Sequence, residues 1–157
     1  PDVSSAASDV YKRQDMVGPY GYCADISRTF VCGNDFNNTQ KELYSMSLEQ
    51  INHNSNLIKA DMSFKEFTEK SWKLPEEYYG NRYSVMVHGI GLCDEWPSIR
   101  YPTDGGDKSG RFLKNMTITV ESYIGKVGGK EGVKLEQQYL VGENGLELMS
   151  HHPLENI

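Results

Sequence analysis

The residues best suited to chemistry in this chain are acidic side chains and a histidine that interrupt apolar segments. They are Asp15, Asp25, His88, Glu121 and Glu136. Glu121 and Glu136 lie inside the β-like runs TITVESYI and VKLEQQYLV, and His88 ends the apolar run YSVMVHG. Any one of them alone could be an ordinary surface residue, but a buried carboxylate needs a cation or hydrogen bonds to compensate its charge. Carboxylates with one imidazole suit a pair of Mn, Fe, Co or Zn ions.

The elements that must position these residues are mostly strands. Runs rich in β-branched and aromatic residues, with Gly and Pro between them, predict short strands joined by turns. The Asn-Gly pair at 144–145 indicates a hairpin near the C-terminus, and residues 97–114 are expected to form a loop. The strands are expected within 15–32, 83–92, 116–125, 133–141 and 146–150.

Two capping boxes predict two helices between the first and later strands. The first is Thr39-Gln-Lys-Glu42, followed by an apolar face that includes Leu43 and Ile51. The second is Ser63-Phe-Lys-Glu66, and its helix should end before Pro75. This order predicts an α+β fold in which helices cover a curved antiparallel sheet. We expect one domain over 15–157, preceded by a non-matching tail or linker over 1–14.

Composition excludes several classes of function. With 38% hydrophobic and 24% charged residues, the chain is typical of a soluble globular protein. No apolar run approaches the roughly 20 residues of a membrane span. The net charge of −6 and the lack of a Lys/Arg cluster argue against a nucleic-acid partner. Three cysteines without a C-x-x-C pair, and no apolar leader, favour a cytoplasmic protein with reduced thiols and no cysteine zinc cage.

The order Asp, Asp, His, Glu, Glu resembles the five-ligand dinuclear site of the pita-bread superfamily, the M24 group that includes aminopeptidase P and creatinase. The segment YGYCADISRTF is similar to the second-aspartate strand of that superfamily, and VMVHGIG is similar to its histidine strand. TITVES and VKLEQQYLV resemble its two glutamate strands. The resemblance runs from Asp15 to the C-terminus. It implies the C-terminal part of a pita-bread fold and two bound metal ions, with the five residues as their ligands.

Departures from the peptidase pattern narrow the resemblance. Peptidases of the superfamily usually have a second histidine in H-G-x-G-H, where this chain has Leu92. They usually have proline and aspartate where this chain has Ser122 and Gln137. The segments HGIGLCDEWPSIRYP and ITVESYIG are instead similar to dimethylsulfoniopropionate (DMSP) lyases of the superfamily from marine bacteria. That similarity implies a cytoplasmic, homodimeric enzyme that cleaves DMSP, a small sulfonium zwitterion, to dimethyl sulfide and acrylate, with iron as the usual metal.

The lyase resemblance also implies roles for further residues. Asp94, six residues after His88, matches the proposed base, and its neighbour Glu95 is the alternative. Tyr83 matches a position that orients the substrate. The sulfonium cation would favour aromatic faces, for which the candidates nearest in sequence are Trp96, Tyr20 and Tyr22. The simpler interpretations are solvated loop acids and aromatic side chains that only pack.

One departure concerns the lyase pattern itself. Lyases of the superfamily carry a further aspartate two residues before the position of Asp15, where this chain has Arg13. Replacing a carboxylate by a cation at this position is expected to weaken metal binding strongly, which predicts that this chain is an inactive fragment of an active parent. Three alternative functions also stay open: an Xaa-Pro aminopeptidase, a creatinase-like hydrolase, and a non-catalytic pita-bread binding module.

Overall fold

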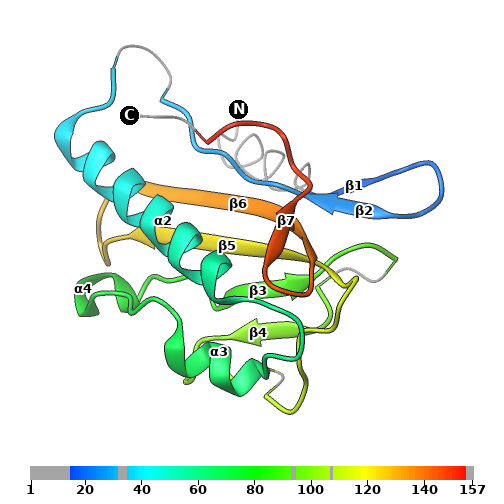
Figure 1. Ribbon diagram of the computed structural model, residues 1–157. Helices are drawn as coiled ribbons and strands as arrows, with labels where there is room; N and C mark the ends of the chain where they lie inside the picture. The colour runs from blue at the N-terminus through cyan, green and yellow to red at the C-terminus, as the bar shows by residue number, and fades with distance from the viewer. Residues whose placement is uncertain (1–14, 32–34, 93–94, 107, 155–157) are drawn as a thin grey trace.

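The structure of this protein is a computed structural model that describes residues 15–31, 35–92, 95–106 and 108–154. The tail expected over 1–14 lies outside these residues, and so do Arg13 and Asp94. Figure 1 shows one curved sheet with helices against it and a separate two-stranded hairpin. The strands are β1 (Asp15–Val17), β2 (Cys23–Asp25), β3 (Val85–Gly89), β4 (Ser98–Arg100), β5 (Thr117–Gly125), β6 (Gly132–Val141) and β7 (Leu146–Leu148).

All strand pairs are antiparallel, as the sequence predicted. The main sheet has the order β4-β3-β5-β6-β7, and β1 pairs only with β2. The longest pairing joins β5 and β6, which face each other from Thr117 and Leu140 to Gly125 and Gly132. This long hairpin forms the centre of the sheet and therefore the platform on which the other elements are placed.

Helix α2 (Asn38–Leu57) crosses one face of the sheet over β5 and β6 (Figure 1). Its buried side includes Leu43, Tyr44 and Ile51, which join sheet residues such as Val120 and Leu135 in the hydrophobic core. Helix α3 (Phe64–Lys70) lies below it near β4, and a one-turn helix α4 (Glu76–Tyr79) follows Pro75. The core thus fills the space between the helices and one sheet face.

The helix boundaries correct one prediction. The N-cap of α2 is Asn37, not Thr39, and its capping box is completed by Gln40 instead of Glu42. Asparagine caps a helix at least as well as threonine, so the helix is capped by Asn37, two residues before the predicted cap. For α3 the predicted N-cap is confirmed, since the Ser63 hydroxyl accepts a hydrogen bond from the Glu66 amide at 3.1 Å.

The loop expected over 97–114 is partly wrong, because β4 lies within it and pairs with β3. Three residues are too few to show the alternation that marks a strand in a sequence. Glycine is required at position 89, where β3 ends and β4 comes back beside it, since a Cβ at this position would lie 2.0 Å from the carbonyl oxygen of Trp96. This close approach places Trp96 directly against the end of β3.

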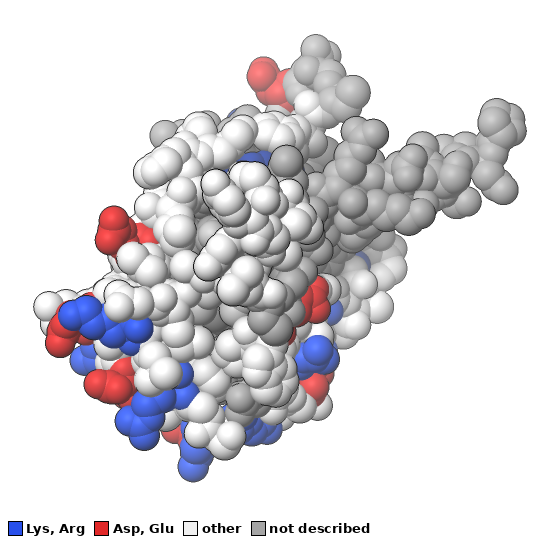
Figure 2. Space-filling model, turned by 90° about the vertical axis from the view of Figure 1, so that its right-hand side faces the viewer, with Lys and Arg blue, Asp and Glu red and all other residues white. Residues whose placement is uncertain are grey.

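Charged side chains of both signs lie beside one another along the lower left of the face in Figure 2. Several exposed ion pairs, such as Lys70–Glu66 and Lys126–Glu77, lie on the surface of the molecule, and each such pair adds little stability. Among the described residues, no helix is both long and apolar enough to cross a membrane.

Candidate metal centre

The sheet register brings the chemistry-bearing side chains to one face. Glu121 of β5 is paired directly with Glu136 of β6, and His88 of β3 is paired with Thr119 of β5. Side chains of directly opposed residues point to the same side of a sheet, and residues two apart on one strand share that side. His88, Glu121 and Glu136 therefore converge on the face opposite to α2.

The atoms of this cluster are within a few ångströms of each other. His88 Nε2 lies 3.3 Å from Glu136 Oε1, 3.8 Å from Glu121 Oε1 and 3.7 Å from Asp25 Oδ2. All four side chains are almost completely buried. The predicted site residues Asp25, His88, Glu121 and Glu136 are thus brought together, and the register pairs Asp15 with Asp25 across the β1–β2 hairpin.

The hairpin is attached to the main sheet beyond β2, and this attachment places Asp25. Ser27 forms an isolated antiparallel bridge with Glu136. The Glu136 amide donates to the Ser27 carbonyl at 3.1 Å, and the Ser27 hydroxyl donates to Glu136 Oε2 at 2.9 Å. On the other side, the Cys23 amide donates to the Gly91 carbonyl at 2.8 Å. Asp25 is held between these two anchors and so faces His88.

Lys134 is a member of the cluster that the sequence interpretation missed. Its Nζ lies 3.1 Å from Glu121 Oε2 and 3.6 Å from Glu136 Oε2, and 4.7 Å from the centre of the Tyr83 ring. A signal was available, because Lys134 is two residues before Glu136 on the same strand and so shares its face. Ser27 was missed as well.

The charges in the cluster perturb one another. Burial alone would lower the pKa of His88, but its contacts with Glu136 and Glu121 raise that pKa to about 9. Burial and the neighbouring Glu136 raise the pKa of Glu121 to about 7. Burial also acts to raise the pKa of Glu136, but His88, Lys134 and Ser27 outweigh it and lower that pKa to about 2. The two glutamates are chemically alike, and it is their different surroundings that shift their pKa values in opposite directions.

The cluster fits a metal ion. Glu121 Oε1 and Glu136 Oε1 are buried and accept no hydrogen bond from the described residues, which suits oxygens that face a cation. His88 Nδ1 lies 3.0 Å from the Gly89 carbonyl, to which it can donate. That bond leaves Nε2 facing the carboxylates, as in metal-binding histidines. Asp25, His88 and Glu136 each offer a ligand atom within 4.8 Å of the others, close to the roughly 3 to 4 Å between ligands of one ion.

Of the other predicted site residues, Tyr83 contacts the cluster. Tyr83 is 39% exposed, and its ring contacts the Lys134 ammonium. Tyr22 and Trp96 are exposed near the segment that follows His88, whereas Tyr20, in the hairpin turn, is 86% exposed. Asp94, the predicted base, is outside the described residues.

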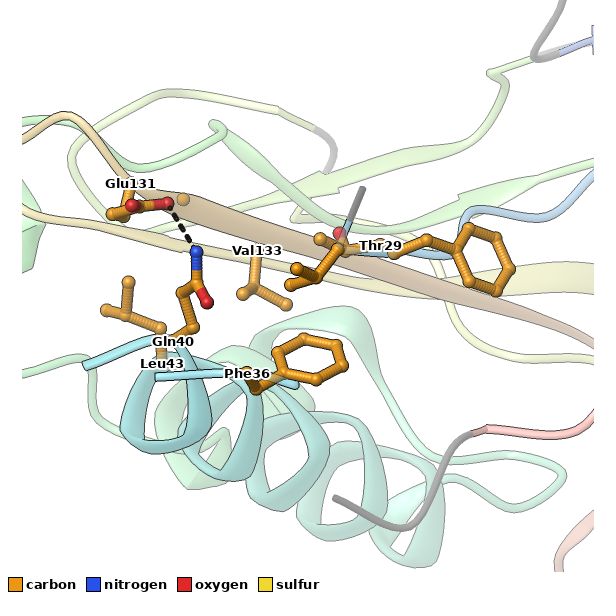
Figure 3. A pocket seen from close by; sticks show the side chains of 9 residues that line it. Thr29, Phe36, Gln40, Leu43, Glu131 and Val133 are labelled. Atoms are coloured by element: carbon orange, nitrogen blue, oxygen red, sulfur yellow. Dashed lines mark hydrogen bonds between the residues drawn. The ribbon is translucent and has the colours of Figure 1, made fainter. Parts of the chain in front are cut away.

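A separate hollow lies where α2 begins and β6 starts (Figure 3). Its volume is about 230 Å³, and the Gln40 amide donates to Glu131 Oε2 across it at 3.3 Å. None of the predicted site residues lines it. The labelled residues of its wall are Thr29, Phe36, Gln40, Leu43, Glu131 and Val133.

Comparisons with known proteins agree with this geometry. A family model described as metallopeptidase family M24 matches residues 13–143. The chain is 35% identical over 145 residues to the dimethylsulfoniopropionate lyase DddP of Roseovarius nubinhibens, covering 90% of this chain and 32% of the relative. It is 34% identical over 134 residues to the Xaa-Pro dipeptidase of Pyrococcus furiosus, covering 82% and 36%.

Among solved structures, the X-Pro aminopeptidase of Thermotoga maritima aligns with a TM-score of 0.68 and 28% identity, over 85% of this chain and 37% of that one. This likeness confirms the fold expected from the sequence, which is a pita-bread fold with a curved antiparallel sheet. The chain spans about a third of the length of the curated relatives that it matches.

Proposed function

Because this chain belongs to metallopeptidase family M24, we propose that it carries the metal-binding part of a lyase that cleaves DMSP to dimethyl sulfide and acrylate. The observation that carries the proposal is the 35% identity to a named DMSP lyase across 90% of the chain. The substrate would be a small sulfonium zwitterion. We further propose a cytoplasmic, homodimeric parent protein.

We propose two metal ions at this centre, with iron the first candidate and Mn, Co or Zn as alternatives. Their proposed ligands are Asp15, Asp25, His88, Glu121 and Glu136. When bound, such ions act as Lewis acids that stabilise negative charge developing on the substrate carboxylate. Carboxylate oxygens and one imidazole nitrogen are a donor set that all four of these metals accept.

The chain's own residues then have three tasks. Asp94 takes the proton from the carbon next to the substrate carboxylate, the C–H electrons form the C=C bond, and the C–S bond breaks to release dimethyl sulfide. Burial and the negative charges of Glu121 and Glu95 raise the pKa of Tyr83 to about 12. Tyr83 therefore keeps its proton and can donate a hydrogen bond that orients the substrate. Trp96, Tyr20 and Tyr22 offer aromatic faces to the sulfonium cation.

A second candidate is hydrolysis of Xaa-Pro peptides, which the 34% identity to the Pyrococcus furiosus dipeptidase favours. The same ligand set would then activate a water molecule. Leu92 counts against this candidate, because it is 71% exposed at the position where peptidases of the superfamily usually have a second histidine. A leucine cannot transfer a proton or bind a charged peptide end.

The test is headspace gas chromatography of dimethyl sulfide after iron-loaded chain is mixed with DMSP. We expect little dimethyl sulfide from the unaltered chain and more from Arg13→Asp, which restores the aspartate of the lyase pattern. In that Arg13→Asp background, Asp94→Asn should reduce the rate by at least a hundredfold, whereas Glu95→Gln, the matched change at the next residue, should retain it. A reversed effect of these two variants would make Glu95 the base.

The same protein is offered an Xaa-Pro dipeptide in parallel. Free proline without dimethyl sulfide, from protein shown to hold metal, would overturn the lyase in favour of the hydrolase. Neither product from metal-loaded protein would favour a non-catalytic binding module.

A further inference from the structure

Lys134 places a positive charge directly on the oxygens of two proposed metal ligands. Its Nζ is 3.1 Å from Glu121 Oε2 and 3.6 Å from Glu136 Oε2, and its side chain is only 20% exposed. The other oxygens of the same two carboxylates face His88 Nε2, at 3.8 and 3.3 Å. The glutamate pair therefore lies between an imidazole on one side and an ammonium on the other.

An ammonium and a metal ion that share these carboxylates interfere with each other in two ways. They compete for the same two carboxylates, since negative charge drawn toward Lys134 at the Oε2 atoms leaves less on the Oε1 atoms that would face a metal ion. They also repel, because two cations a few ångströms apart at a poorly solvated site interact strongly. Screening by water is weak here, since Glu121 and Glu136 are almost fully buried.

We propose that Lys134 is a built-in counter-ion that competes with metal ions for Glu121 and Glu136 and so weakens metal binding at this centre. The inference rests on the proposed metal centre and goes beyond it, because it assigns a residue that limits the occupancy of that centre. Lys134 is a positioning residue in this role and takes no part in bond breaking.

The structure also supplies a place for the ammonium when a metal ion holds the glutamates. Lys134 Nζ lies 4.7 Å from the centre of the Tyr83 ring, and an ammonium over an aromatic face is stabilised by the ring electrons. A small movement of the Lys134 side chain toward Tyr83 would release the glutamate oxygens and keep the ammonium out of the hydrophobic core.

A purely structural ion pair predicts the opposite behaviour. If Lys134 only held the glutamates in place, its removal would let them repel each other and would weaken metal binding. Competition predicts that the same removal strengthens binding. The sign of the change in metal affinity therefore separates the two roles.

The test is isothermal titration calorimetry of MnCl₂ into the chelator-treated chain at one fixed pH. Lys134→Met should bind Mn²⁺ at least tenfold more tightly than the unaltered chain. Lys130→Met, at an exposed lysine in the turn that precedes β6, should bind as the unaltered chain does. Lys134→Arg keeps the charge and should stay within about threefold of it. Unchanged or weaker binding by Lys134→Met, or no Mn²⁺ binding by any of these proteins, would overturn the inference.

Thermal unfolding of the same proteins gives a second readout. In chelator, Lys134→Met should unfold at a lower temperature than Lys130→Met, because the buried glutamates lose their counter-ion. Saturating Mn²⁺ should then raise its unfolding temperature by more than that of the unaltered chain. If Lys134→Met does not fold in chelator, Lys134→Gln replaces it, with the same expected signs. These readouts follow metal binding and not turnover, so protein that binds Mn²⁺ as expected but releases no dimethyl sulfide would count against the lyase alone.

Discussion

At the scale of single residues, the protonation state of His88 controls how tightly the centre can bind a metal ion. Its pKa is raised to about 9 against an ordinary value of 6.5. The imidazolium therefore stabilises the folded chain fully below about pH 6.5, and this contribution is lost as the pH rises through 9. A metal ion needs the neutral imidazole and must displace the proton.

We therefore predict that Mn²⁺ affinity rises with pH between about 6.5 and 9, by up to tenfold per unit from His88 alone. Below about pH 7 the proton on Glu121 should steepen the dependence further. Calorimetric titrations at pH 6.5, 7.5 and 8.5, in buffers of different ionisation enthalpy, measure the affinity and count the released protons. The exposed-site variant His151→Gln should show the same slope. An affinity independent of pH would contradict the prediction.

The sequence predicted the cluster of Asp25, His88, Glu121 and Glu136 because each interrupts an apolar or β-like segment. The spacing of Lys134 from Glu136 puts both residues on one face of the strand, but it does not show what the lysine contacts. A lysine side chain is long and flexible, and on a strand it usually extends to water. Only the register of β5 with β6 shows that this one turns over the two glutamates.

At the scale of elements, α2 contributes a row of buried polar groups behind the centre. The hydroxyls of Ser47 and Ser122 lie 3.0 Å apart, and Ser122 also donates to Gln50 Oε1 at 2.6 Å. Gln50 Nε2 donates in turn to the Tyr101 hydroxyl at 2.6 Å. Because Ser122 is next to Glu121 on β5, the network fixes the helix against the strand that carries a proposed ligand.

Gln50→Leu should lower the free energy of unfolding by about 1–3 kcal/mol, since it leaves the buried hydroxyls of Ser122 and Tyr101 without this partner. Urea unfolding followed by circular dichroism measures the change. Asn52→Leu, at an exposed position of the same helix, should stay within about 0.5 kcal/mol. Equal effects of the two changes would show that the network adds no stability.

The apolar pattern of α2 was visible in the sequence, and Leu43 and Ile51 are buried as expected. The buried polar residues of the helix were not predicted, because a serine or glutamine on a helix is more often at the surface. Their partners come from β5 and from Tyr101, far along the chain. Strand β4 was missed for a different reason, since its three residues show no period.

At the scale of the whole molecule, Arg28 ties three distant parts of the chain together. Its guanidinium donates to the carbonyls of Ser27 and Pro153 at 2.8 and 3.0 Å, and also to the Glu136 carbonyl and the Gln137 side chain. It thereby links the segment after β2, the middle of β6 and the C-terminal segment.

Arg28→Ala should lower the free energy of unfolding by about 2 kcal/mol, because several charge-assisted hydrogen bonds are lost together. Hydrogen exchange should also accelerate at the amides of residues 150–152 and of Leu154, in the segment that Arg28 holds to the sheet. Arg111→Ala, at an exposed arginine, is the control and should leave both measurements nearly unchanged. Unaltered exchange of the C-terminal segment in Arg28→Ala would refute the linking role.

Apart from β4 and the one-turn helix α4, the order of elements and the antiparallel sheet followed from the sequence, because the longer strands and helices leave a periodic pattern. The attachment of the hairpin through Ser27, and of the C-terminal segment through Arg28, did not. Both depend on backbone carbonyls as acceptors. Every residue has a backbone carbonyl, so the sequence does not show which one accepts a given hydrogen bond.

The direct pairing of Glu121 with Glu136 has a consequence for the order in which the chain folds. A hairpin whose strands are neighbours in sequence can form early, but two carboxylates placed opposite each other oppose that step. Lys134, on β6 itself, supplies one positive charge within the hairpin, 3.1 Å from Glu121 Oε2, whereas His88 adds a second only when β3 docks. We expect the β5–β6 hairpin to form early and to become fully stable only after β3 has docked. The two side chains that would serve chemistry in the finished protein thus make its central hairpin depend on a third strand.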